Sequence, residues 1–364
     1  MVDVDDTSRS LSWHQARCMV RKLVAGFRAA GLKPGDCVSI AAFNDIMYPM
    51  LFRGLVGAGG IFSGSNPAYT YFEIEHHVRT AQVRFVVAEP GLLDAVLEGS
   101  KGLVDRENIF IFNVTGQTVP REFRSWEWLL QHGEEDWIRF TGVEKCRKTS
   151  VARLTTSGTT GPPKMAVQSH RNAVSWFTQG HEISRPPWEV RQLYPLPMFH
   201  VATVPLVHAG PFRTGHVCYI MRRFELEPYL APIERHRIST LGCGAAPLDN
   251  DSGERLKALC APDCTFTQVQ GMTETTGAVS LFYYPDEDDT GSVGNTSMPN
   301  TGVKLINDED EDITDYDIRG ELCVRGPSVI DEYFKNPEAN AESWDSEGYF
   351  KTGDIMYCDS KTKK

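Results

Sequence analysis

Apolar residues in the first third of the chain follow two different periods. Between positions 13 and 30 they recur every three or four residues, which predicts an amphipathic helix, and Gly31 followed by Pro34 marks its end. Residues 38–43 form a mostly apolar stretch typical of a buried strand, and a second helix is expected from about 45 to 58. Further strands are predicted at 83–88 and 109–112. This alternation indicates a mostly parallel sheet covered by helices on both faces.

The later part of the chain divides into two further regions. A second alternation of strands and helices runs from 154 to about 281, with a strand at 217–221 and a helix at 228–237. From 291, short strand-like pieces such as 303–306 and 320–326 alternate with turn residues, which predicts a small distorted barrel or antiparallel sheet. We therefore expect an α/β fold with two βα-layered lobes and a smaller β-rich lobe. The expected divisions are 1–150, 151–284 and 285–364.

The composition is that of an ordinary globular protein, with 41% hydrophobic and 23% charged residues among 364. A net charge of −11 without a stripe of Lys and Arg argues against nucleic-acid binding. The acidic runs at 286–289 and 308–312 lack the glycine and spacing of a calcium loop, so we expect solvated loops. The nine cysteines show no pairing or zinc-ligand spacing. Neither a secretory signal nor an apolar stretch long enough for a membrane span is visible.

A segment rich in hydroxyl side chains and glycine carries the strongest chemical signal. Residues 154–164 read LTTSGTTGPPK. Glycines let backbone N–H groups turn toward phosphate oxygens, hydroxyls add donors, and Lys164 adds a positive charge. The prolines before Lys164 exclude a Walker A motif. A polyphosphate-binding loop is predicted, and a flexible linker is the alternative. Its predicted binding residues are Thr156, Ser157, Gly158, Thr159, Thr160, Gly161 and Lys164.

Four more segments follow the loop in order along the chain. They read LPMFHV at 196–201, GCGAAPL at 242–248, QGMTE at 270–274 and YFKTGD at 349–354. With the loop, this series resembles the adenylate-forming superfamily, which includes acyl-CoA synthetases, luciferases and the adenylation domains of peptide synthetases. The resemblance extends from about residue 10 to residue 357. The chain is most similar to the coumarate–CoA ligases, through LKPGD at 32–36 and NPAYT at 66–70.

The resemblance implies roles for individual residues. Lys164, His200, Thr273 and Glu274 are expected to be catalytic. In this assignment His200 flanks the substrate carboxylate, Thr273 bonds the α-phosphate, and Glu274 holds Mg²⁺, which prefers oxygen ligands. Asp354 is expected to accept hydrogen bonds from two ribose hydroxyls. The residues expected around adenine are Gly244, Ala245, Ala246, Pro247, Gln270, Gly271 and Met272.

The reaction implied by the resemblance has two halves. A carboxylate attacks the α-phosphorus of ATP and expels pyrophosphate, and a thiol, most often that of coenzyme A, then displaces AMP. The first half needs charge stabilisation more than acid–base chemistry, because negative charge spreads over phosphate oxygens. The expected ligands are therefore ATP, Mg²⁺, coenzyme A as co-substrate and a small carboxylic acid. The expected location is cytoplasmic, with peroxisomal as the alternative, and the oligomeric state stays open.

Three departures from the family pattern lead us to expect impaired activity. The sequence stops at Lys364, before the hinge and C-terminal lid domain that relatives carry. Near Ser239 an internal segment of several tens of residues is expected to be missing, which would expose apolar surface. Gln270 stands where relatives have an aromatic ring against adenine, and Glu332 stands where they usually have glycine.

Two other functions remain possible from the sequence. A peptide-synthetase-type adenylation domain would need an acidic residue to meet the substrate ammonium group, and residues 201–206 offer none. A non-catalytic nucleotide-binding remnant is favoured by the early stop and by the gap near Ser239. The acyl group cannot be identified, because the segment that lines its pocket is the one expected to be missing.

Overall fold

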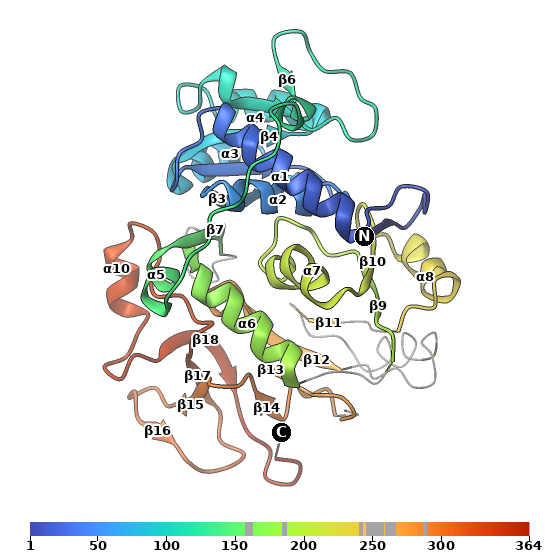
Figure 1. Ribbon diagram of the computed structural model, residues 1–364. Helices are drawn as coiled ribbons and strands as arrows, with labels where there is room; N and C mark the ends of the chain where they lie inside the picture. The colour runs from blue at the N-terminus through green and yellow to red at the C-terminus, as the bar shows by residue number, and fades with distance from the viewer. Residues whose placement is uncertain are drawn as a thin grey trace.

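The computed structural model describes residues 1–156, 163–183, 188–239, 243–244, 258, 267–286, 288 and 290–363. In Figure 1 the N-terminal lobe, coloured blue to teal, lies at the top, and the β-rich part, coloured orange to red, lies at the bottom. The mixed α/β fold expected from the sequence is confirmed. No helix in the described ranges is both long and apolar enough to cross a membrane.

A seven-stranded sheet forms the centre of the N-terminal lobe. Its strands run in the order β6-β5-β4-β2-β3-β7-β8, and all neighbours are parallel except the antiparallel pair β7 and β8. The bounds are β2 (Cys37–Ala41), β3 (Ile61–Ser65), β4 (Val83–Ala88), β5 (Ile109–Ile111), β6 (Arg124–Ser125), β7 (Ser150–Thr155) and β8 (Met165–Ser169). The sheet therefore continues past residue 150, and the division into lobes at that point stays a prediction.

Helices cover both faces of this sheet, as the sequence predicted. The helices are α1 (Trp13–Ala29), α2 (Tyr48–Gly57), α3 (Tyr71–Ala81) and α4 (Leu93–Gly99). Successive residues of a strand point to opposite faces. Accordingly Val38 and Ile40 pack with α1 and α2, whereas Cys37 and Ala41 pack with α3 and α4. Helix α1 begins at a capping box on Ser12, which satisfies its first backbone N–H groups.

Two further sheets lie in the middle of the chain. One is parallel, in the order β1-β10-β9, and joins the first residues of the chain to a strand more than two hundred positions away. The other has the order β11-β12-β13-β14. The elements are β1 (Val2–Asp3), α6 (His170–Ile183), β9 (Arg191–Tyr194), α7 (Gly210–Thr214), β10 (Val217–Ile220), α8 (Leu226–Arg235), β11 (Cys243–Gly244), β12 (Gln268–Met272), β13 (Gly277–Leu281) and β14 (Thr296–Ser297).

The β-rich part contains an antiparallel sheet in the order β16-β15-β17-β18. Its strands are β15 (Gly302–Ile306), β16 (Asp312–Ile313), β17 (Gly320–Arg325) and β18 (Phe350–Met356), with α10 (Pro337–Glu342) before β18. Helix α5 (Val143–Lys148) precedes β7 and contacts α6. The predicted strands at 303–306 and 320–326 agree with β15 and β17 to within one residue. The apolar surface expected beside the gap near Ser239 falls outside the residues that the structure describes.

Acid should destabilise the fold through its buried histidines. The His77 ring contacts the hydroxyls of Ser63 and Thr155, and burial lowers the pKa of His77 to about 4. Burial also lowers the pKa of His208 to about 3. A histidine in the unfolded chain titrates near about pH 6.5. Between about pH 6.5 and 4 the unfolded chain therefore binds protons that the folded chain does not, and stability falls.

The urea midpoint should drop as the pH is lowered from about 7 to about 4.5. His77→Gln keeps a polar side chain that cannot titrate, so its midpoint should fall less steeply. His14→Gln, which changes an exposed histidine, serves as the control and should follow the parent. If His77→Gln shows the same pH slope as the parent, acid destabilisation does not come from this ring.

Candidate functional site

The ends of the predicted phosphate loop are joined by two hydrogen bonds. Thr156 donates its backbone N–H to the Lys164 carbonyl at 2.9 Å, and the Lys164 N–H donates to the Thr156 hydroxyl at 3.2 Å. These two residues follow and precede the antiparallel strands β7 and β8, so the hydrogen bonds extend the pairing of the two strands. The expected contacts of Ser157, Gly158, Thr159, Thr160 and Gly161 lie outside the described residues.

Tyr333 lies between Glu274 and Lys164 and contacts both side chains. The Tyr333 hydroxyl donates to Oε1 of Glu274 at 2.7 Å, and Nζ of Lys164 lies 4.9 Å from the centre of the Tyr333 ring. Glu274 is only 6% exposed. Burial raises the pKa of Glu274, while the hydrogen bond from Tyr333 and the charge of Lys164 oppose that rise. Burial and the nearby carboxylate also raise the pKa of Tyr333, which keeps its proton and remains a donor.

Close packing of the backbone positions Thr273 and Glu274. They lie in a one-turn 3-10 helix between β12 and β13. At Gly271 a Cβ would come within 2.3 Å of the Gly277 carbonyl oxygen, so only glycine fits there. The Glu274 carbonyl accepts the N–H of Ile330 at 2.8 Å, which ties this turn to the segment that carries Tyr333. Thr273 is buried beside Glu274, and its carbonyl accepts a hydrogen bond from Gln168.

A second contact joins residues 84 positions apart. Nε2 of Gln270 donates to Oδ2 of Asp354 at 2.7 Å. Gln270 is 8% exposed, and its Oε1 is buried without a hydrogen-bond partner in the described structure. Asp354 follows Gly353, whose φ of 76° favours glycine, at an irregular point in the pairing of β17 and β18. The charge of Asp354 is felt at Glu274, where it raises the pKa of that carboxyl.

Other predicted residues lie around this cluster or apart from it. Gly244 in β11 pairs with Val269, the neighbour of Gln270, while Ala245, Ala246 and Pro247 lie outside the described residues. Met272 ends β12. His200 is exposed, and its Nδ1 accepts the N–H of Ala202 at 3.3 Å. No hydrogen bond or ion pair among the described residues joins His200 to Glu274 or Lys164.

Tyr333 was not among the predicted site residues. The sequence offers no local sign of its role, because its partner Glu274 is 59 positions away. The backbone just before His200 is also constrained by a residue far away in the sequence, Gly64. A Cβ at Gly64 would come within 2.5 Å of the backbone of Phe199, so β3 must carry glycine at that point.

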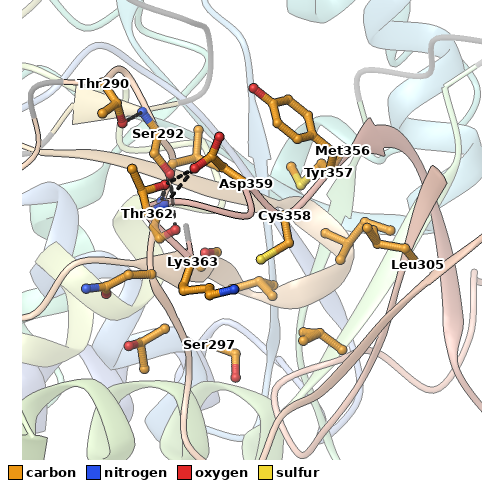
Figure 2. A pocket seen from close by; sticks show the side chains of 18 of the residues that line it. Thr290, Ser292, Ser297, Leu305, Met356, Tyr357, Cys358, Asp359, Thr362 and Lys363 are labelled. Carbon is orange, nitrogen blue, oxygen red and sulfur yellow. Dashed lines mark hydrogen bonds between the residues drawn. The ribbon is translucent and has the colours of Figure 1, made fainter. Parts of the chain in front are cut away.

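A separate hollow of about 570 Å³ lies beside the β-rich sheet (Figure 2). Figure 2 shows Cys358 and Met356 among aliphatic and hydroxyl side chains. Close by, the Thr362 hydroxyl donates a hydrogen bond to Asp359. Among the residues that the structure describes, none predicted to bind the nucleotide or to act in catalysis lines this hollow. Gln270, Glu274 and Asp354 lie instead where β12, β18 and the segment around Tyr333 meet.

Comparison with known families identifies the class of protein. The family described as "AMP-binding enzyme" matches residues 1–243 and 235–334, and the chain belongs to this family. The two matched ranges overlap at 235–243, and the segment expected to be missing after Ser239 stays a prediction. The similar structures include the luciferase-like enzyme of the mealworm Zophobas morio, with a TM-score of 0.86, 21% identity, and coverage of 99% of this chain and 88% of that one. This similarity supports the fold alone.

Curated relatives are similar over nearly the whole chain. "Acyl-CoA synthetase ACTT5" of Alternaria alternata is 55% identical over 391 aligned positions, which cover 99% of this chain and 68% of the relative. "Acyl-CoA ligase azaF" of Aspergillus niger is 40% identical, with 100% and 74% covered. Because 391 positions exceed the 364 residues of the chain, the first alignment contains gaps opposite residues that the relative has and this chain lacks.

Removing the Tyr333 hydroxyl should destabilise the fold in a pH-dependent way. In Tyr333→Phe the buried Glu274 carboxylate loses a donor, which costs about 1–3 kcal/mol of unfolding free energy. The loss should be full at pH values where Glu274 is ionised. It should shrink in acid, because a protonated carboxyl depends less on that donor. Urea unfolding of the parent and Tyr333→Phe at several pH values measures this.

Tyr349→Phe is a matched control, since Tyr349 is only half-buried and its hydroxyl has no role in this contact. An unfolding free energy of Tyr333→Phe equal to that of the control at neutral pH would mean that the Glu274 contact contributes nothing to stability.

Proposed function

We propose that this chain is an ATP-dependent acid–CoA ligase, or the major part of one, which forms an acyl-adenylate and then a coenzyme A thioester. Membership of the AMP-binding family supports the adenylation step. The relatives named acyl-CoA synthetase and acyl-CoA ligase support the thioester as the product. The single observation that carries the proposal is the meeting of Lys164, Glu274, Gln270 and Asp354 around one point of the fold.

The proposed chemistry consists of two successive nucleophilic substitutions. A carboxylate oxygen of the acid attacks the α-phosphorus of ATP, the bond to the bridging oxygen breaks, and pyrophosphate leaves. The sulfur of coenzyme A then attacks the acyl carbon, the bond to the AMP oxygen breaks, and the thiol proton goes to solvent. Negative charge develops on phosphate oxygens in the first step, so pre-positioned cations and donors lower the barrier most.

In this proposal the charged residues stabilise the phosphates. Lys164 and the hydrogen-bond donors of residues 156–161 are assigned to bind the phosphate oxygens, and Thr273 to donate to the α-phosphate. Glu274 suits a magnesium ion, because it is a buried carboxylate with only one oxygen engaged by Tyr333. Bound there, Mg²⁺ would supply positive charge to the phosphates. Tyr333 then acts as a positioning residue that fixes the direction of the carboxylate.

The remaining assignments concern the nucleoside and the acid. Asp354 is proposed to accept from the ribose hydroxyls, with Gly244 and Gln270 near adenine. His200 is proposed to flank the substrate carboxylate. Because a relative from Aspergillus niger, 40% identical, is named phenylacetyl-CoA ligase, an aryl acid of the kind that coumarate–CoA ligases use is the proposed substrate class.

A nucleotide-binding remnant is the second candidate, and one observation favours it. Gln270 already occupies an oxygen of Asp354 that the ribose would need. A nucleotide must displace this hydrogen bond or share the carboxylate with it. The two candidates differ in chemistry, since only a ligase exchanges pyrophosphate with ATP in the presence of its acid.

Acid-dependent exchange between ATP and pyrophosphate should be detectable with the purified chain. The acids to compare are phenylacetate, cinnamate, nicotinate, a fatty acid and an amino acid. Glu274→Gln keeps the shape of the side chain but removes its charge, and should lower the exchange rate by about 100-fold or more. Glu98→Gln, which changes an exposed carboxylate, should leave it unchanged. AMP binding without exchange for any acid would favour the remnant, and exchange with the amino acid alone would favour a peptide-synthetase-type domain.

Gln270→Tyr should increase the affinity for AMP. The substitution provides an aromatic face worth about 0.5–1.5 kcal/mol, a few-fold to about tenfold in affinity. It also releases Asp354 from the amide. Asp354→Ala should lose most of the binding, because two charge-assisted hydrogen bonds disappear. Calorimetric titration of the three proteins, with near-ultraviolet circular dichroism to compare folding, is the measurement. Equal affinities in well-folded parent and Gln270→Tyr would refute adenine docking at this position.

A further inference from the structure

A second hollow, of about 650 Å³, lies between the start of α6 and the segment that follows β17. Three arginines line it: Arg147 at the end of α5, Arg171 in the first turn of α6, and Arg325 at the end of β17. Asp331 is the one carboxylate among the described residues that line it. The wall therefore carries three positive charges and one negative charge, in a chain whose net charge is −11.

Existing contacts leave most of this positive charge uncompensated. Asp331 accepts two hydrogen bonds from Arg147, both at 2.9 Å, which accounts for the single carboxylate. Arg325 donates to the backbone carbonyl of Glu347 at 2.7 Å and lies over the Tyr349 ring. Neither of these two groups carries a charge. Arg171 makes no ion pair or hydrogen bond with a side chain in the described structure. The excess of two positive charges therefore lies at Arg171 and Arg325.

The position of Arg171 makes its isolation costly. It is half-buried and is the second residue of a 14-residue helix. The N-terminal end of a helix carries partial positive charge, so a cation there is repelled and an anion is attracted. An arginine without a carboxylate partner at this end is unfavourable by itself. An anion in the hollow would pair with Arg171 and remove this repulsion.

We propose that this hollow is a binding site for a phosphate-bearing small molecule, either inorganic phosphate or a phosphomonoester. A phosphate carries a charge of about −1.5 to −2 at neutral pH, which matches the excess at the wall. Guanidinium groups present several N–H donors in a planar fork that suits phosphate oxygens. Arg147 keeps N–H groups that Asp331 does not use. Beyond the arginines, Trp344 provides an aromatic wall for the rest of an ester.

The proposed phosphate site is separate from the candidate nucleotide site. None of Lys164, Glu274 and Asp354 lines the hollow. An adjoining hollow shares Arg147 and Asp331 and adds Glu144, Glu332 and Lys148. Three carboxylates and two basic side chains line it, so it has no excess of positive charge. The proposal does not depend on the ligase assignment, because it rests on residues that the reaction does not use.

Titration of the full chain with inorganic phosphate, at constant ionic strength set with chloride, tests the proposal. Calorimetry should show binding in about the millimolar range, and Arg171→Gln should weaken it about tenfold. Arg171→Gln breaks no ion pair, so its unfolding midpoint should equal or exceed that of the parent. Arg79→Gln, an exposed arginine on α3, is the charge-matched control and should bind as the parent does. Arg325→Gln is a second variant that should also weaken binding.

Lys164→Ala distinguishes the two candidate sites. It should bind phosphate as tightly as the parent if the ion occupies the arginine-lined hollow. Loss of binding in Lys164→Ala together with unchanged binding in Arg171→Gln would overturn the proposal, and so would a parent that binds neither inorganic phosphate nor glycerol 3-phosphate. Comparison of these two ligands separates the sources: tighter binding of the ester identifies a phosphomonoester site, and tighter binding of the ion a phosphate site.

Discussion

One buried hydrogen bond, from the Tyr333 hydroxyl to the Glu274 carboxylate, links two sheets of this protein. Tyr333 lies beside β8 of the seven-stranded sheet, where Phe334 donates its N–H to the Met165 carbonyl. Glu274 follows β12 of the middle sheet. A carboxylate removed from water is costly unless donors satisfy it. The rest of the candidate site depends on this contact, because it sets where the carboxylate points.

Close approach of backbones is the second constraint on the site. Gly271 lies against Gly277, and Gly64 lies against Phe199, at distances that exclude a Cβ. These contacts hold the turn that carries Glu274 and the loop that carries His200. Because a protein interior is close-packed, such positions leave few alternative arrangements of the side chains that they support. The geometry of the site is therefore largely set by residues without functional groups.

The contact between Gln270 and Asp354 would limit nucleotide binding at the proposed site. It satisfies one amide group and one carboxylate oxygen, but it leaves Oε1 of Gln270 buried without a partner in the described structure. An unsatisfied buried acceptor is unfavourable. A ligand that donates to this oxygen would gain from it, whereas a ligand that needs the whole Asp354 carboxylate must break the existing bond. If the nucleotide binds at the proposed site, the balance between these effects sets its affinity.

The sequence by itself determined the class of fold, the family and the order of the site segments. The spacing of apolar residues and the apolar runs are local features of the sequence. The predicted helix at 13–30 and strand at 83–88 therefore agree with the structure almost to the residue. The motifs predicted Lys164, Glu274 and Asp354 because their residue types are tied to phosphate, metal and ribose chemistry. Only the tertiary structure decided that Tyr333 holds Glu274, that Gln270 holds Asp354, and that Arg147, Arg171 and Arg325 share one hollow. These contacts join residues from 24 to more than 170 positions apart, and no local pattern records which distant side chains burial and strand pairing bring together.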